Sequence, residues 1–170
     1  MRKVEVVPHN PQWRSIFEIE SQYIANALGE NAIAIHHMGS TSIETIYAKP
    51  IIDILVEVQN LLEVDRRNLE MESLNYQVMG EFGIKDRRFF LKDDRAGLRT
   101  HHVHIFEVNS AQVKRHLAFR DYLLSHPEAA QEYSDLKRKL AAEYPNNIAE
   151  YQARKAEFIK DIDRQASPPQ

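Results

Sequence analysis

The chain has 170 residues, 43% hydrophobic and 28% charged, a size and balance typical of one soluble globular domain. The formal net charge is −3, so no overall positive field draws the chain to nucleic acid or to an anionic membrane. Because the chain has no cysteine, disulfides, thiolate metal sites and cysteine nucleophiles are excluded.

The first half of the chain alternates between strand-like and helix-like patterns. Its predicted elements are, in chain order, a strand at 3–7, a helix from Asn10-Pro11 to Gly29, a strand at 32–37, a short helix at 42–47, a strand at 51–58 and a helix at 60–74. Asparagine followed by proline is typical of a helix start, and glycine is typical of a helix end.

The second half predicts a β-hairpin followed by helices. Its elements are strands at 88–91 and 101–108 joined across a loop at 93–97, a helix at 110–124, a helix beginning at Ser125-His126-Pro127-Glu128 and a last helix at 148–162. The serine followed three residues later by Glu128 matches a capping box. Strands mixed with helices, then a helical C-terminal part from about residue 110, predict an α+β fold with one mixed β-sheet flanked by helices.

Nothing in the sequence directs the chain to a membrane. The N-terminus has no apolar run of signal-peptide length, and no segment approaches the roughly 20 apolar residues that span a bilayer. We therefore expect a cytoplasmic protein with no membrane partner and no nucleic-acid partner. Because the sequence has no repeat or linker, we predict one domain over residues 1–166 and a disordered tail at 167–170.

A glycine turn and a carboxylate are the first candidate for chemistry. Gly39-Ser40 closes one predicted strand, and Asp53 lies within the next. A glycine turn lets N–H groups and a hydroxyl approach a phosphate, and a rigid carboxylate can hold the cation that neutralises it. Leu55 stands where a two-metal site needs a second carboxylate, and Glu57 lies about 13 Å from Asp53 along the strand. A hydrogen-bonded structural aspartate is the alternative.

A histidine cluster is the second candidate. His101, His102 and His104 fall in one predicted strand, and His102 and His104 share a face. If this strand neighbours Asp53, one carboxylate and two imidazoles face one site, a set that favours manganese, iron or zinc over magnesium for a single ion. The alternatives are acid–base catalysis, a phosphate contact by a protonated imidazole, or two hydrogen-bonded histidines on a half-buried strand.

Basic side chains are the third candidate, because lysine and arginine bind phosphate. They are Lys49, Arg87, Arg88, Arg99, Arg120, Lys137 and Lys155. Most residues of this kind are solvated surface charges. Aromatic residues do not interleave with them as they do in a single-strand binding groove.

Several segments also occur together in a recognisable order. They are HMGSTS, AKPIIDILV, RRFF, RTHHVHIFE, RHLAFRDYL and the spacing of Tyr151, Lys155 and Phe158-Ile159. In this order, from Val4 to about Ile162, the chain resembles the GrpB family of uncharacterised bacterial proteins, which is placed in the nucleotidyltransferase superfamily. The resemblance implies a nucleotidyltransferase-like fold with a helical C-terminal extension.

The resemblance also implies roles for particular residues. In active members of that superfamily a Gly-Ser turn holds the triphosphate, and three carboxylates bind divalent cations. Carried over, Gly39 and Ser40 match the turn. Thr41 and Ser42 beside it, and Lys49, Arg88 and Arg99 as neutralising charges, complete the expected phosphate- or nucleotide-binding residues. Asp53, His102 and His104 become the expected metal ligands and catalytic residues, with magnesium or manganese, or else zinc, as the cofactor. Leu55 departs from the superfamily at the second carboxylate position, where the GrpB family itself usually has leucine. The strand that should bring the third acid carries His102 and His104 instead, and Glu44-Thr45 stands where the family usually has Pro-Gly.

Three functions remain open from the sequence. The first is metal-dependent nucleotidyl transfer from a nucleoside triphosphate to an unidentified acceptor. The second, favoured by Leu55, is a non-catalytic module that binds a nucleotide or phosphorylated metabolite. The third is phosphoester hydrolysis at a single metal, where bound water is the nucleophile. Each expects a nucleotide or another phosphorylated small molecule as the partner, and the oligomeric state stays open.

Overall fold

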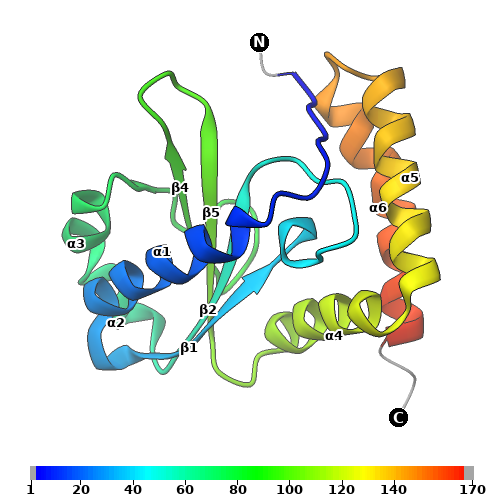
Figure 1. Ribbon diagram of the computed structural model, residues 1–170. Helices are drawn as coiled ribbons and strands as arrows, with labels where there is room; N and C mark the ends of the chain where they lie inside the picture. The colour runs from blue at the N-terminus through cyan, green and yellow to red at the C-terminus, as the bar shows by residue number, and fades with distance from the viewer. Residues whose placement is uncertain (1–2, 167–170) are drawn as a thin grey trace.

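The computed structural model describes residues 3–166, so the predicted tail at 167–170 lies outside the described residues. Five strands form one sheet in the order β1-β2-β5-β4-β3 (Figure 1). The strands are β1 (Ala32–Met38), β2 (Ile52–Val58), β3 (Gln77–Val78), β4 (Arg88–Asp93) and β5 (Arg99–Glu107). β2 and β5 pair in parallel and the other pairs are antiparallel, so the sheet is mixed, as predicted.

Helices flank this sheet and then extend beyond it. They are α1 (Gln12–Leu28), α2 (Leu61–Asp65), α3 (Asn68–Ser73), α4 (Ala111–Ser125), α5 (Pro127–Glu143) and α6 (Ile148–Ala166), with 3-10 turns η1 (Gly29–Asn31) and η2 (Ser40–Ser42). The last three helices stand together at one side of the sheet (Figure 1). None of the described helices is both long enough and apolar enough to cross a bilayer.

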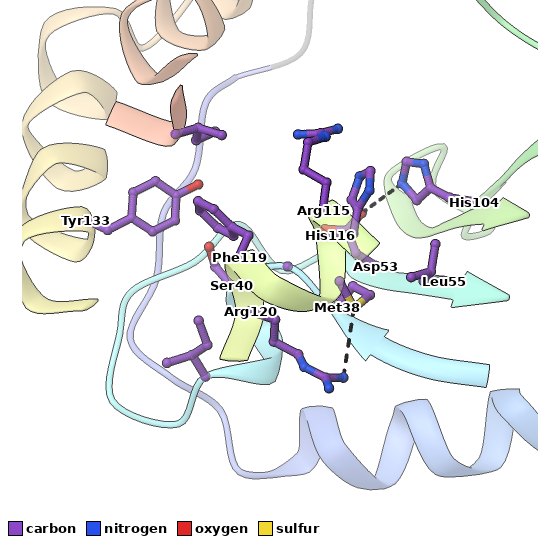
Figure 2. Close-up of a pocket in the computed structure, with 13 residues that line it drawn as sticks. Met38, Ser40, Asp53, Leu55, His104, Arg115, His116, Phe119, Arg120 and Tyr133 are labelled. Carbon is purple, nitrogen blue, oxygen red and sulfur yellow. Dashed lines mark hydrogen bonds and ion pairs between the residues drawn. The ribbon is translucent and has the colours of Figure 1, made fainter. Parts of the chain in front are cut away.

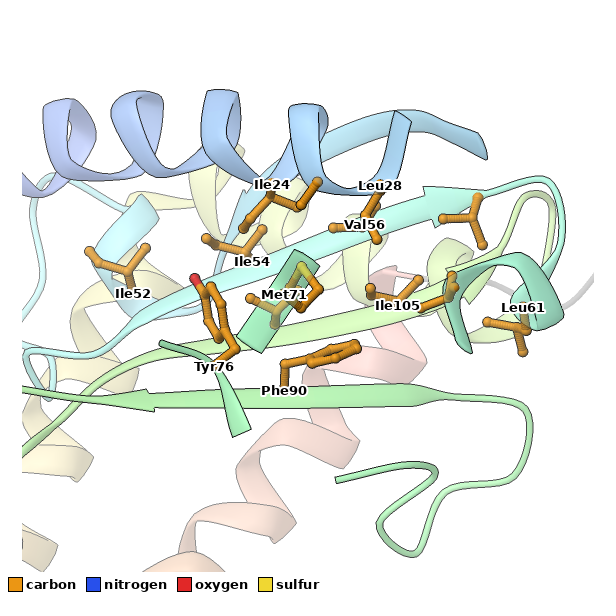
Figure 3. Packing of buried hydrophobic residues seen from close by; sticks show 14 of the residues in the cluster. Ile24, Leu28, Ile52, Ile54, Val56, Leu61, Met71, Tyr76, Phe90 and Ile105 are labelled. Atoms are coloured by element: carbon orange, nitrogen blue, oxygen red, sulfur yellow. The ribbon is translucent and has the colours of Figure 1, made fainter. Parts of the chain in front are cut away.

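The main core lies between the sheet and the N-terminal helices. Alternate β2 residues, Ile54 and Val56 among them, pack with Ile105 of β5 and Ile24 of α1, all fully buried (Figure 3). Because strand side chains alternate between faces, Asp53 and Leu55 face away from this core. The N-terminal core therefore holds β2 rigidly while its other face is left for a site.

The C-terminal helices hold the loop that follows η2. Ile43 and Ile46 from this loop are buried against Leu123 and Ile162, which belong to α4 and α6. The Ser134 hydroxyl of α5 accepts a hydrogen bond from the Tyr47 N–H at 2.9 Å. The loop between β1 and β2 is therefore fixed by sequence-distant helices rather than by its own local conformation.

Four element predictions were wrong in detail. The segment at 3–7 is not a strand but makes one bridge, between Val7 and Ala48. The helical turn predicted at 42–47 lies earlier, at η2, and the helix predicted at 60–74 is broken into α2 and α3 around Arg66 and Arg67. β3 was not predicted, because its two exposed residues carry no apolar pattern.

The predicted capping box was a fifth error. Ser125 ends α4, where its hydroxyl donates to the carbonyls of Asp121 and Tyr122 and leaves the start of α5 uncapped. Pro127 instead takes the first position of α5, where its missing N–H costs nothing. The true serine cap is Ser110, whose hydroxyl accepts from a backbone N–H at the start of α4.

Candidate functional site

The parallel pairing of β2 with β5 brings the predicted carboxylate and imidazoles together. In this register Asp53 pairs with His102 and Leu55 pairs with His104. Asp53 Oδ1 lies 3.4 Å from His102 Nδ1 and 3.7 Å from His104 Nε2. One ligand atom from each of the three residues lies within 4.8 Å of the others, a spacing at which one ion could contact all three.

Position 39 requires glycine because the backbone there lies in contact with the Asp53 carboxylate. Met38 at the end of β1 pairs with Asp53, so the following glycine lies directly against the carboxylate. Its φ of +68° lies in the left-handed region, and a Cβ at this position would stand 2.5 Å from Asp53 Oδ2. The Gly-Ser turn and the carboxylate are thus packed together as one unit.

Two cavities meet at this unit. The first, about 260 Å³, is mostly apolar and is lined by Phe119, Tyr133 and Ile159, although Arg115 and Arg120 also line it (Figure 2). The second, about 220 Å³, contains three lysines. Ser40, Asp53 and His104 line both cavities. A molecule bound across this wall would meet an apolar surface on one side of Asp53 and a cationic surface on the other.

The Asp53 carboxylate is ionised in this setting. Burial by itself raises the pKa of Asp53, but the interactions with His102 and His104 outweigh burial and hold the pKa well below its usual range. The side chain remains 32% exposed, so it can be reached from solvent. It is therefore an anionic ligand that a cation can approach.

Two arginines determine which ring nitrogen carries the proton in His102 and in His104. Arg87 Nη1 lies 3.2 Å from His104 Nδ1, and Arg99 Nη1 lies 3.1 Å from His102 Nε2. A guanidinium can only donate, so each of these ring nitrogens is an acceptor. In the neutral imidazoles the proton must then occupy the nitrogen that faces Asp53.

This proton arrangement bears on which ligands could hold a metal. A metal-bound imidazole usually donates its second N–H to an acceptor, but here arginine donors occupy those positions. Ligation by both histidines would need both arginines to withdraw. A cation held by Asp53 alone would leave both arginine contacts in place, and magnesium or manganese there could complete its shell with phosphate oxygens and water. The donor set therefore fits an oxygen-preferring cation held mainly by Asp53.

A profile of the family described as GrpB protein matches residues 3–165. The chain belongs to the GrpB family. It is 44% identical over 165 residues to the UPF0157 protein YqkA of Bacillus subtilis, covering 97% of this chain and 48% of YqkA. It is 36% identical over 163 residues to the glutamate-rich protein GrpB of Alkalihalophilus pseudofirmus, covering 94% of each. This chain therefore spans about half the length of YqkA and nearly all of the second relative.

A solved structure shares the fold. The crystal structure of conserved protein GrpB from Enterococcus faecalis has a TM-score of 0.90 and 42% sequence identity, covering 95% of this chain and 96% of that chain. At this similarity the arrangement of helices around the mixed sheet is that of a GrpB protein. The predicted membership of the GrpB family is confirmed.

Several predicted phosphate ligands of this GrpB-family chain lie at the site, and others point away. Ser40 and Lys49 line the lysine-bearing cavity, as does Thr41, whose hydroxyl also contacts His37 Nε2 at 2.9 Å. The Ser42 hydroxyl donates to the Gly39 carbonyl, and Ser42 lines a separate cavity with Thr41. Thr41 and Ser42 thus mainly stabilise the turn.

Of the two predicted phosphate-binding arginines, one lies at the site and the other points away from it. Arg99 lies beside His102 and is also paired with Asp93 at 2.5 Å. Arg88 projects from the opposite face of β4 and forms a two-pronged ion pair with Asp65, so it does not reach the site. Its neighbour Arg87 occupies the site face instead, because adjacent strand residues point to opposite sides.

The site includes helical residues that the sequence predictions named only as basic candidates or, for Tyr133, not at all. Tyr133 and Lys137 of α5 and Lys155 of α6 line the cavities. One signal was present, since Tyr133, Lys137 and Leu140 follow the spacing of a buried helix face, on which a lysine is unusual. The i,i+4 spacing of Tyr151 and Lys155 is a second signal, because it places both side chains on one face of α6.

Proposed function

We propose that this GrpB-family chain binds a nucleoside triphosphate with one divalent cation at Asp53 and transfers the nucleotidyl group to an acceptor. One observation supports this assignment above the others. Asp53, the Gly39-Ser40 turn and His104 converge on the wall between an apolar cavity and a cationic one. A nucleoside triphosphate has the matching chemistry, because the α-phosphate joins a nucleoside, whose base has flat aromatic faces, to an anionic phosphate chain. We also propose that this fold is related to the fold of nucleotidyltransferases.

Each group then has a defined part in the transfer. An acceptor hydroxyl gives up its proton to water and its oxygen attacks the α-phosphorus. The bond from that phosphorus to the α,β-bridging oxygen breaks, and pyrophosphate leaves with the electron pair. Ser40 and the turn would orient the α-phosphate, and His104 would donate its Asp53-facing N–H to hold the carboxylate in place. A cation bound at Asp53 supplies charge neutralisation of the phosphate oxygens. Positioning and electrostatics account for most catalysis in reactions of this kind.

Binding without transfer is a second candidate, and Leu55 favours it. This side chain is only 1% exposed and packs with Met38, Phe106 and Val113. It fills the position at which a second carboxylate would hold a second cation. In this alternative the same groups bind the nucleotide, but no bond to the α-phosphorus is broken.

Calorimetry with each nucleoside triphosphate tests the proposal, followed by an assay of pyrophosphate release. We expect wild type to bind at least one of ATP, GTP, CTP and UTP in the presence of Mg²⁺ or Mn²⁺. Asp53→Asn keeps the side-chain shape but removes the anionic ligand, so it should weaken cation-dependent binding at least tenfold. Asp135→Asn, at an exposed position on α5, is the matched control.

The outcomes separate the candidates. Binding with pyrophosphate release in the presence of an acceptor supports transfer, whereas binding without release supports the binding module. If no nucleotide binds with either cation, both are wrong. If Asp53→Asn binds as tightly as Asp135→Asn, the role given to Asp53 is wrong.

A further inference from the structure

Three lysine ammonium groups from different elements enter the second cavity. Lys49 comes from the loop before β2, Lys137 from α5 and Lys155 from α6. The carboxylate among the lining residues is that of Asp53. Three cations and one anion give this cavity a formal charge of +2 before any histidine is counted, which is an unusual excess for a partly enclosed space.

Lys137 is the most deeply placed of the three. Its side chain belongs to a residue only 2% exposed, and its Nζ donates to the Tyr47 carbonyl and lies 4.6 Å from the centroid of the Tyr133 ring. A carbonyl dipole and a ring face compensate the loss of hydration less well than a carboxylate does. Burial, followed by the charges of Lys155 and Lys49, lowers the pKa of Lys137 to about 7.

Lys155 and Lys49 converge on a single aromatic ring. Their Nζ atoms lie 5.2 Å and 4.9 Å from the centroid of Tyr151. Burial, and to a smaller extent the charge of Lys49, lowers the pKa of Lys155 to about 8, so its ammonium group is both poorly hydrated and close to another cation. An anion placed between the ammonium groups would relieve this repulsion and restore the lost hydration.

We propose that this lysine cavity, lined by Lys49, Lys137 and Lys155, binds a chain of at least two phosphates. In the reaction this would be the pyrophosphate end of the nucleoside triphosphate, and that assignment rests on the proposed function. The lining, with three ammonium groups and one carboxylate, suits a phosphate chain better than a nucleoside. The nucleoside would lie in the apolar cavity beyond Ser40.

Binding of bare phosphate chains, without metal, tests the cavity independently of nucleotide chemistry. Calorimetry in the presence of EDTA would use orthophosphate, pyrophosphate and tripolyphosphate. We expect affinity to rise at least tenfold from orthophosphate to pyrophosphate, because the longer chain reaches more ammonium groups. Lys137→Met and Lys155→Met should each weaken pyrophosphate binding at least tenfold.

Two controls make the result specific. Lys139→Met changes an exposed lysine on the same helix, with a side chain 72% exposed, and should leave pyrophosphate binding unchanged. Asp53→Asn should tighten metal-free pyrophosphate binding, because it removes a carboxylate that repels the anion from this cavity. Circular dichroism would show that Lys137→Met is folded, and Lys155→Met carries the test if it is not.

The possible failures are distinguishable. If wild type does not bind pyrophosphate, or if all three lysine variants behave alike, the lysine cavity is not a polyphosphate site. If pyrophosphate binds through Lys137 and Lys155 but no nucleoside triphosphate binds with any cation, the cavity stands and the proposed nucleotidyl transfer falls.

Discussion

Gly39 and Asp53 show how closely two single residues can depend on each other. The glycine has no Cβ, and the Asp53 carboxylate occupies the space where one would be. Its backbone conformation, with φ at +68°, is also one that other residues rarely adopt. The glycine is therefore needed here for the position of the carboxylate, whereas the sequence had suggested a close approach of backbone to phosphate.

Gly39→Ala should both destabilise the protein and displace the Asp53 carboxylate. Gly97→Ala is the matched control, because Gly97 also has positive φ but has open space where a Cβ would be. We expect a loss of about 2 kcal/mol or more in the free energy of unfolding for Gly39→Ala, against roughly 1 kcal/mol for Gly97→Ala. Chemical denaturation measures both, and equal losses would mean that the contact with Asp53 has no energetic consequence.

The arginine contacts predict different tautomers for two histidines in the same strand. In the neutral form, the proton of His102 should lie on Nδ1 and that of His104 on Nε2, because Arg99 and Arg87 donate to the opposite nitrogens. Long-range ¹⁵N NMR correlations distinguish the two tautomers. The proton of His102 on Nε2, or of His104 on Nδ1, would contradict these arginine contacts.

At the scale of elements, the sheet explains why part of the site could be predicted. Strand periodicity is local, so alternation alone placed His102 and His104 on one face and Leu55 beside Asp53. The choice between Arg87 and Arg88 depended on the register of β4 against β5, which no local pattern gives. The loop after η2 likewise depends on packing against Leu123 and Ile162, which lie far along the chain.

Helix starts give a direct test of which serine acts as a cap. Ser110→Ala removes the acceptor for a backbone N–H of α4 and should lower the free energy of unfolding by about 1 kcal/mol. Ser125→Ala should cost less than half as much, because this hydroxyl only donates to carbonyls at the end of α4. Urea denaturation of both variants measures these two losses. A larger loss for Ser125→Ala would indicate that Ser125 caps α5 after all.

At the scale of the whole molecule, the site joins two parts of the chain that are far apart in sequence. The sheet supplies Asp53 and the histidines, and the C-terminal helices supply Lys137 and Lys155. The sequence could identify these lysines as basic residues but not their convergence, because convergence depends on how α5 and α6 pack around the loop after η2. Because these lysines are buried, their titration should also make the free energy of unfolding depend on pH.

The free energy of unfolding should rise with pH between about 7 and 9. Lys137 has a folded pKa of about 7, whereas an unfolded lysine has a pKa near 10.4, so the unfolded state binds more protons in this window. Lys155, with a folded pKa of about 8, adds to the same trend. Above pH 9 the buried tyrosines, with raised pKa values, act in the opposite direction.

Lys137→Met provides the comparison for this pH dependence. The groups around the ammonium are Lys49, Asp53, Tyr133 and Lys155, and the variant keeps all of them. Replacing a poorly compensated buried charge by an apolar chain of similar size should raise the melting temperature at pH 7 and flatten its rise toward pH 9. Thermal denaturation across this range measures both effects, and a wild-type curve that is flat or falls would contradict the account.

The central claim is that one nucleotide lies across Asp53, with its phosphates toward the lysines. The most direct measurement is a crystal structure with Mn²⁺ and a non-hydrolysable nucleoside triphosphate, using anomalous scattering to locate the manganese. We predict manganese bound to the Asp53 carboxylate and to phosphate oxygens, with the terminal phosphates among Lys49, Lys137 and Lys155. Manganese bound elsewhere, or a triphosphate lying outside the lysine cavity, would contradict it.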